Sequence, residues 1–341
     1  VDTYTMKKDI PIRQRGFQET DIVKIMEPIT KYSVCIDDLK AIRYELEKAY
    51  YLATSGNPGP VVIDLPADIQ RANIDIDDLE GFSPSSVEED RSLEASFDTI
   101  KEALEASERP CLLIGNGIKI SGQEENIKIL VETLRIPAVF SMPAFDILAY
   151  DHEFNYGFIG ANGHRYGNFI LGKSDLIITM GSRLDLKQVG NIRENFAPQA
   201  QIIRIDIDAG NLLYKVHQDE VDLKIDVKKL IPYLLQHIDM LPKCNTTWNN
   251  VCKVLKNELQ GFDEKEYNHL ITKIGDKIPD NYSITSDVGQ SGVWIAQNLH
   301  LKKSQRVYMS AGHGAMGFSL PAAIGVYYGR KKPVVCFNGD G

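Results

Sequence analysis

The residues from Val334 to Gly341 are of the types that can hold a metal ion against a phosphate. An apolar run, Val334-Val335-Cys336-Phe337, predicts a buried β-strand, and Asn338-Gly339-Asp340-Gly341 follow it directly. At the carboxyl end of a parallel strand, glycines let the backbone approach phosphate oxygens, and an aspartate supplies a hard oxygen ligand. The alternative is an ordinary turn in which Asp340 caps a helix, and this short motif taken alone favours that alternative.

Two further segments could bring ligand groups to the same edge of a sheet. Residues 310–325 follow a predicted strand and open a helix of small residues, with glycines at 312, 314 and 317 that would let the backbone touch a ligand. Asp287-Val288-Gly289-Gln290-Ser291 follow another strand. Three converging loops predict a diphosphate site in which Asp340 carries Mg²⁺. The alternative for 310–325 is a tight crossover without a ligand, with Met316 in the core.

The middle of the chain carries a weaker nucleotide signal. Glycines and charged residues follow several predicted strands there, and they could contact a diphosphate or a ribose hydroxyl. Ordinary turns and helix caps explain the same residues equally well, because a lone Gly-x-Gly is common in parallel α/β domains. The candidate residues are Gly115, Asn116, Gly117, Gly181, Arg183, Asp206 and Asp208.

Composition narrows the class of protein. The chain has 341 residues, 25% of them charged and 43% hydrophobic, with a formal net charge of -9. The negative charge and the lack of a basic stripe argue against nucleic acid as a partner. No apolar stretch is long enough for a membrane span, and the first residues lack the apolar core of a signal peptide, which predicts a cytoplasmic protein. Five scattered cysteines without Cys-x-x-Cys spacing predict reduced thiols.

Strands alternate with helices through most of the chain, which predicts an α/β fold with doubly wound parallel sheets. The first unit, 1–75, has a helix at 39–50 and a strand at 61–66, and an acidic, serine-rich linker spans 76–90. The second unit, 91–240, has four predicted strands, at 110–115, 137–140, 176–181 and 201–206. The third, 262–341, has strands at 283–287, 307–310 and from 334.

Together these segments resemble the thiamine-diphosphate-dependent enzymes, and most closely the acetolactate synthase (acetohydroxyacid synthase) large subunits. The motifs that carry the resemblance run through the whole chain in order, and the last two are the most specific. They are residues 16–23, which begin Gly16-Phe17-Gln18-Glu19, with 28–31, the turn at 53–61, Asp287-Val288-Gly289-Gln290, Gly314-Ala315-Met316-Gly317-Phe318 with 320–323, and Gly339-Asp340-Gly341.

The resemblance implies a three-domain enzyme, a transferase of branched-chain amino acid biosynthesis, that decarboxylates a 2-keto acid such as pyruvate and joins the product to a second keto acid. Residues 1–75 would belong to a pyrimidine-binding domain, 91–240 to a central domain, and 262–341 to a diphosphate-binding domain. Thiamine diphosphate would lie between the subunits of a homodimer or homotetramer. The implied cofactor-binding residues are Gly289, Gln290, Gly314, Ala315, Met316, Gly339 and Gly341, with Asp340 as the Mg²⁺ ligand and Phe17 and Gln18 as candidates for the substrate pocket.

The resemblance also places two functional groups outside the chain. The glutamate that drives cofactor tautomerisation is expected upstream of Val1, and the asparagine that completes the metal site is expected after Gly341. The 341-residue chain by itself is therefore expected to have no turnover.

Several positions depart from the acetolactate synthase pattern and bear on FAD and on the substrate. Asn57 stands where that family usually has arginine, Ala67 where lysine is usual, and Ser291 where histidine is usual. The segment 181–187 lacks the expected paired aspartates and arginine. Because a hydrogen bond to a charged group contributes about 1.5–3 kcal/mol, losing several cationic partners makes FAD doubtful. Two alternatives therefore stay open: a related lyase, decarboxylase or diketone hydrolase, and a non-catalytic nucleotide-binding module.

Overall fold

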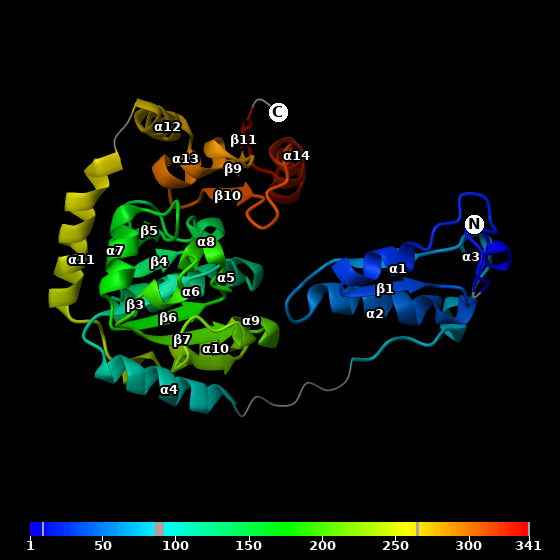
Figure 1. Cartoon of the computed structure of the whole chain (residues 1–341), viewed down its shortest axis with the longest axis horizontal. Helices are drawn as coiled ribbons and strands as arrows, with labels where there is room; N and C mark the ends of the chain where they lie inside the picture. Colours follow the sequence, from blue (N-terminus) through cyan, green and yellow to red (C-terminus); the bar gives the residue numbers. More distant parts are fainter. Residues whose placement is uncertain (9, 85–91, 264–265, 340–341) are drawn as a thin grey trace. The chain divides into compact units, whose positions relative to one another are not determined.

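A computed structural model describes residues 1–8, 10–84, 92–263 and 266–339. The chain divides into two compact units, Val1–Glu89 and Asp90–Gly341, and each is described by itself (Figure 1). Across the described ranges, no helix is both long and apolar enough to cross a membrane.

The first unit is built on two parallel strands, β1 (Tyr32–Cys35) and β2 (Val61–Asp64), with helix α2 (Ile42–Thr54) between them in the chain. Both strands are half-buried along their length. The helix and the strand predicted here are confirmed. The remaining elements are α1 (Ile22–Met26), α3 (Ala67–Arg71) and short 3-10 turns at Thr3–Thr5, Glu27–Ile29, Leu39–Ala41 and Ile76–Asp78.

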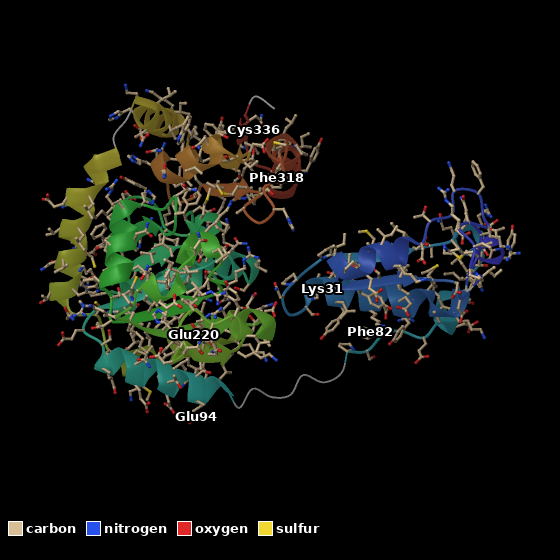
Figure 2. All side chains as sticks on the ribbon, viewed as in Figure 1. Lys31, Phe82, Glu94, Glu220, Phe318 and Cys336 are labelled. Atoms are coloured by element: carbon tan, nitrogen blue, oxygen red, sulfur yellow. The ribbon has the colours of Figure 1, made fainter. Side chains whose placement is uncertain are left out.

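The segment after α3 returns along α2 and packs on its aromatic face. The ring of Phe82, labelled in Figure 2, lies 5.4 Å from the ring of Tyr44 and 5.5 Å from that of Tyr51, measured between centroids. The Phe82 backbone N–H also donates to a carboxylate oxygen of Glu47 at 2.7 Å. These contacts fix the last described part of this unit against the helix.

The second unit contains a six-stranded parallel sheet in the order β5-β4-β3-β6-β7-β8. Every residue of the three central strands β3, β4 and β6 is buried, as expected of a sheet covered on both faces. Successive strands are added outward from β3 in one direction and outward from β6 in the other. The strand order therefore reverses between β3 and β6, while all the strands stay parallel. The strands are β3 (Pro110–Ile114), β4 (Ala138–Phe140), β5 (Asn155–Phe158), β6 (Leu176–Met180), β7 (Gln201–Asp206) and β8 (Val221–Lys224).

Helices connect these strands on the two faces of the sheet (Figure 1). Several begin at a polar residue that caps them; for example, the Asp226 side chain accepts the N–H of Lys228 at the start of α10. The helices are α4 (Ser92–Ala106), α5 (Gly117–Ile120), α6 (Glu124–Leu134), α7 (Arg165–Lys173), α8 (Leu186–Val189), α9 (Ala209–Leu213) and α10 (Val227–Gln236), with 3-10 turns at Met142–Ala144, Arg193–Asn195 and Ile238–Met240.

The four strands predicted for this sheet are confirmed, but two edge strands escaped the sequence pattern. β5 contains Asn155 and Gly157, the latter with a φ of +69°, and so it breaks the apolar run by which the other strands are recognised. β8 alternates apolar and charged residues and is only partly buried. Edge strands carry fewer of the residues that mark a buried strand, so the prediction stopped at four.

A second, three-stranded parallel sheet follows in the order β10-β9-β11. Ile284 of the central strand lies opposite Val307 on one side and Val335 on the other. The three predicted strands are confirmed, as is the doubly wound α/β class. The elements are α11 (Thr246–Leu259), a 3-10 turn (Gln260–Asp263), α12 (Glu266–Lys277), β9 (Ser283–Ser286), α13 (Gln290–Asn298), β10 (Arg306–Met309), α14 (Ser319–Arg330) and β11 (Val334–Phe337).

Candidate cofactor site

The site is organised by Asp287, which follows the central strand β9 directly. Its side chain is buried, and its own N–H donates to the carbonyl of Phe337 at 3.0 Å, at the end of β11. One carboxylate oxygen accepts the N–H of Val288, and the other accepts the N–H of Gly317, both at 2.9 Å. A single residue therefore ties the ends of two strands to the glycine-rich loop after the third.

The glycine-rich loop, residues 311–317, is exposed at this edge of the sheet. Gly314 and Gly317 have φ values of +67° and +77°, a backbone conformation that glycine adopts without strain. A Cβ added at Gly317 would meet nothing within 4 Å, and one at Gly314 would only touch Val288 at 3.7 Å. Met316 is 86% exposed, so the alternative that it belongs to the core is wrong. The loop leaves open space beside its backbone, which a ligand could fill.

The first residue of α14 is locked onto the sheet beneath the loop. The Ser319 hydroxyl donates to Thr285 Oγ1 on β9 at 2.9 Å and lies 3.2 Å from the Cys336 sulfur on β11. Figure 2 labels Cys336, and also Phe318 at the end of the loop. Because Ser319 and Thr285 are fully buried, these contacts set where the loop ends and the helix begins.

The start of α13 supplies the second set of free groups. Gly289 is its N-terminal capping residue, with a φ of +88°, and Gln290 is its first residue; both are exposed. The first N–H groups of a helix have no partner within the helix and carry its positive dipole end, so they suit an anion such as a phosphate. A Cβ at Gly289 would meet nothing within 4 Å, which leaves this end of the helix open to a ligand.

The end of β11 completes the edge. Asn338 and Gly339 are exposed there, while the predicted metal ligand Asp340 and its neighbour Gly341 lie outside the described residues. Among the residues that are placed, no group of three or more His, Cys, Asp or Glu side chains could hold a metal ion. The structure thus brings Gly289, Gln290, the 314–316 loop and Gly339 to one edge of the sheet.

The sequence did not identify Asp287 as the residue that assembles these loops. It was noted only as part of the motif that leads to Gln290, because its partner Gly317 is 30 residues away in the chain. The sequence did contain one signal: an aspartate placed between a predicted buried strand and a glycine. A carboxylate that is buried there must accept hydrogen bonds from nearby N–H groups. Asp287 holds the loops in place, whereas the exposed backbone of the glycines is open to a ligand.

The predicted nucleotide residues of the central sheet also lie together, at the reversal between β3 and β6. The Gly117 N–H donates to the Gly181 carbonyl at 3.0 Å. A Cβ on Gly115 would lie 2.0 Å from that same carbonyl oxygen, so glycine is required there by the contact between the two loops. Asn116, between them, is half-exposed. Close packing of one backbone on the other accounts for these glycines.

The acidic residues after β7 are engaged locally. Asp206 is buried and accepts the N–H of Asp208 at 2.8 Å, and burial raises the pKa of its carboxyl group. The Asp208 side chain accepts the Gly210 N–H and caps α9, as the helix-cap alternative predicted. Arg183 is exposed and lies 3.4 Å from a carboxylate oxygen of Asp185.

The two substrate-pocket candidates lie in the first unit on an exposed turn. Phe17 is 86% exposed, and Gln18 has a φ of +59°. The Glu19 carboxylate holds this turn by accepting backbone N–H groups of Lys7, Arg15 and Gly16, and these hydrogen bonds lower the pKa of Glu19.

Two family models match the second compact unit, Asp90–Gly341. Residues 97–234 match the thiamine pyrophosphate enzyme central domain, and residues 287–341 match the thiamine pyrophosphate enzyme C-terminal TPP binding domain. The chain belongs to the thiamine pyrophosphate enzyme family. The second match begins at Asp287, so the edge of the β9 sheet described above falls within the TPP-binding domain of that family. Thiamine pyrophosphate is another name for thiamine diphosphate.

Individual members of the thiamine pyrophosphate enzyme family match nearly the whole chain. The acetolactate synthase isozyme 1 large subunit of Escherichia coli is 32% identical over 335 residues, which cover 96% of this chain and 58% of the relative. The acetolactate synthase large subunit of Lactococcus lactis is 34% identical and covers 97% of this chain and 58% of the relative. The acetolactate synthase, chloroplastic, of Arabidopsis thaliana is 32% identical, and the match covers 97% of this chain and 51% of the relative. The chain therefore spans somewhat more than half the length of these relatives.

Proposed function

We propose that the full-length protein decarboxylates a 2-keto acid, with pyruvate as the first candidate, and joins the resulting fragment to a second keto acid, as acetolactate synthase does. The observation that carries the proposal is the Asp287 carboxylate bound to the Gly317 N–H at 2.9 Å, which assembles two open glycine loops at one edge of the matched TPP-binding domain. The likeness to acetolactate synthase large subunits over 96% of the chain supports the choice of reaction.

The residues present fit thiamine diphosphate. Gly289 and Gly314 leave open space beside backbone that a side chain would narrow, and the free N–H groups at the start of α13 suit a diphosphate. Gln290 and Gly339 would contact the diphosphate, with Gly341 after them, while the 314–316 backbone and the Met316 side chain would hold the aminopyrimidine. When bound, this cofactor supplies an electron sink for the decarboxylation.

Mg²⁺ is the second proposed cofactor, with Asp340 as the ligand that this chain contributes. The support is the chemistry of the donor: a carboxylate oxygen is a hard ligand, and it follows the strand whose end is bound to Asp287. Phe17 and Gln18 are proposed for the substrate pocket, because Glu19 holds them on an exposed turn.

FAD stays a doubtful third cofactor in this proposal. Arg183, one of its candidate partners, lies beside Asp185. Visible absorbance of the purified full-length protein tests this point, and a flavin spectrum would show that FAD binds.

The domain limits and the assembly are proposed on the same basis. We place a pyrimidine-binding segment at 1–75, a linker at 76–90, a central domain at 91–240 and a diphosphate-binding segment at 262–341. A homodimer or homotetramer with the cofactor between subunits is proposed from the family likeness. The cytoplasmic location stays a prediction, since the name of the Arabidopsis thaliana relative includes the word chloroplastic.

A product assay on the full-length protein tests the proposed function. With pyruvate, thiamine diphosphate and Mg²⁺ we expect acetolactate, and omission of either cofactor should abolish it. Acetaldehyde without acetolactate would indicate the related decarboxylase, and turnover only on a diketone would indicate the hydrolase. Calorimetry showing nucleotide binding but no Mg²⁺-dependent binding of thiamine diphosphate would overturn the enzyme proposal. The 341-residue chain assayed alone should give no acetolactate.

A further inference from the structure

A buried ion pair joins helix α5 to the segment after β4, at the carboxyl edge of the central six-stranded sheet. Lys119 Nζ donates to both carboxylate oxygens of Asp146, at 2.9 and 3.0 Å, and to the Pro143 carbonyl at 3.2 Å. The Asp146 side chain is 1% exposed and that of Lys119 is 17% exposed. Charges removed from water to this extent persist only when they are paired and hydrogen-bonded, so the geometry of this pair is tightly constrained.

Both members of the pair also bind one residue of the second sheet. The Val307 N–H donates to Asp146 Oδ2 at 2.9 Å, and the Val307 carbonyl accepts from Lys119 Nζ at 3.2 Å. Arg306 adds a bond from its guanidinium to the Asp146 carbonyl at 3.3 Å. Val307 lies in β10, which pairs with β9 on one side only among the described strands. The ion pair thus satisfies backbone groups on the open side of that strand.

The strand held in this way leads directly into the glycine-rich loop. β10 ends at Met309, and the glycine-rich loop 311–317, which contains Gly314 and Met316, follows after Ser310. At its far end the loop is bound to Asp287 through Gly317. The loop is therefore anchored to the β9 strand end after Met316, and to the central domain, through β10, before Gly314.

We propose that Lys119 and Asp146 are positioning residues for thiamine diphosphate: they fix β10 to the central domain, and so hold the 314–316 loop where it meets the cofactor. The proposal rests on the proposed function of that loop. The pair touches neither cofactor nor substrate, and acts only through the Val307 backbone.

The test compares cofactor binding and stability in the full-length protein. In Lys119→Met the apparent Kd for thiamine diphosphate should rise at least tenfold, while kcat at saturating cofactor and the KM for pyruvate change less than threefold. Lys119→Arg, which keeps the charge, should recover most of the affinity. The control is Lys253→Met on α11, which removes an exposed ion pair with Glu153 and should leave the Kd unchanged.

Asp146→Asn provides a second variant of nearly unchanged shape, for the case in which Lys119→Met does not fold. Hydrogen–deuterium exchange should then accelerate across residues 307–318, and more than across 334–337. A purely structural role would lower the unfolding midpoint but leave the Kd within twofold of wild type, and that result would overturn the proposal. Failure of the wild-type protein to bind thiamine diphosphate would instead contradict the proposed function. The experiment therefore distinguishes a failure of the positioning proposal from a failure of the proposed function.

Discussion

The carboxylate of Asp287 accepts the backbone N–H of Gly317 at 2.9 Å, across 30 residues of sequence. The same side chain accepts the N–H of Val288, so the two loops it joins share one buried acceptor. Two sharp turns with positive φ, at Gly289 and at Gly317, are held on either side of it. The open space beside each of these two glycines therefore depends on one buried residue.

Replacement of Asp287 should weaken both the loop and the cofactor site. We expect Asp287→Ala to lower the free energy of unfolding by about 2 kcal/mol, because two N–H groups lose a charged acceptor, and to raise the Kd for thiamine diphosphate at least tenfold. Urea unfolding and calorimetry measure the two effects. Asp280→Ala is the matched control: that exposed aspartate also accepts a backbone N–H, from Ser304, but before the start of β9. Equal Kd changes in both variants would contradict the assigned role.

The contact between the two central glycine loops makes a different prediction. Gly115→Ala would place a methyl group 2.0 Å from the Gly181 carbonyl oxygen, and we expect a loss of about 1–3 kcal/mol or more in the free energy of unfolding. Gly172 in α7 provides the control, since a Cβ there meets nothing within 4 Å. Gly172→Ala should stabilise by about 0.5–1 kcal/mol, because alanine loses less backbone entropy in a helix. Equal effects of the two substitutions would show that the loops can separate.

A second buried ion pair holds the segment between β7 and β8. Arg204 donates to Glu220 at 2.7 Å and to the carbonyl of Asn211 at 2.9 Å, and the two side chains are 1% and 0% exposed. We expect Arg204→Met to cost about 3–5 kcal/mol, since Glu220, labelled in Figure 2, would stay buried and lose the guanidinium. It would keep only the N–H groups of Val216 and His217 and the Lys215 ammonium group at 3.8 Å. The double variant Arg204→Met with Glu220→Leu should lose much less than the sum of the single changes. Additive losses in urea unfolding would argue against a coupled pair.

The pH dependence of stability should contain a contribution from His300. Its ring stacks on Tyr150 at 3.7 Å between centroids, and both line a groove of about 530 Å³ that also includes Asp276, Lys302 and Lys303. Burial lowers the pKa of His300 below its usual value of 6.5; Lys256 lowers it further, and Asp276 opposes the shift. The pKa of His300 is therefore lower in the folded state than in the unfolded state. Its contribution to the free energy of unfolding is fully present above the unfolded-state pKa and is lost as the pH falls through the folded-state pKa.

The urea midpoint should therefore fall less between about pH 7 and about pH 5 in His300→Phe than in the wild type, since phenylalanine keeps the stacked ring but cannot take up a proton. An identical slope in wild type and His300→Phe would refute the assignment.

The sequence predicted β6 from an apolar run and missed β5, in which Asn155 and Gly157 interrupt the run. β6 was evident because Leu176 to Met180 are all apolar apart from one threonine, and in the structure all five are buried. β5 was missed because Asn155 looks like a loop residue; in the structure its side chain donates to the carbonyls of Leu148 and Ala149. Side-chain hydrogen bonds of this kind do not appear in local periodicity.

The candidate site divides along the same line. Glycines that need a positive φ and follow a strand are visible in a sequence, so Gly289 and Gly314 could be named from it. The contact between Asp287 and Gly317, and the ion pair that holds Val307, join residues that are far apart in the chain. Only the packing of one sheet edge against another element makes these residues neighbours.

The hydroxyl of Ser319 joins helix α14 to two strands at once, through Thr285 on β9 and Cys336 on β11. A small rotation of the helix would strain both contacts together, so disorder in the glycine-rich loop would be transmitted to the Cys336 sulfur. That cysteine is half-buried. The rate at which a thiol reagent modifies Cys336 would then report how well the glycine-rich loop is ordered.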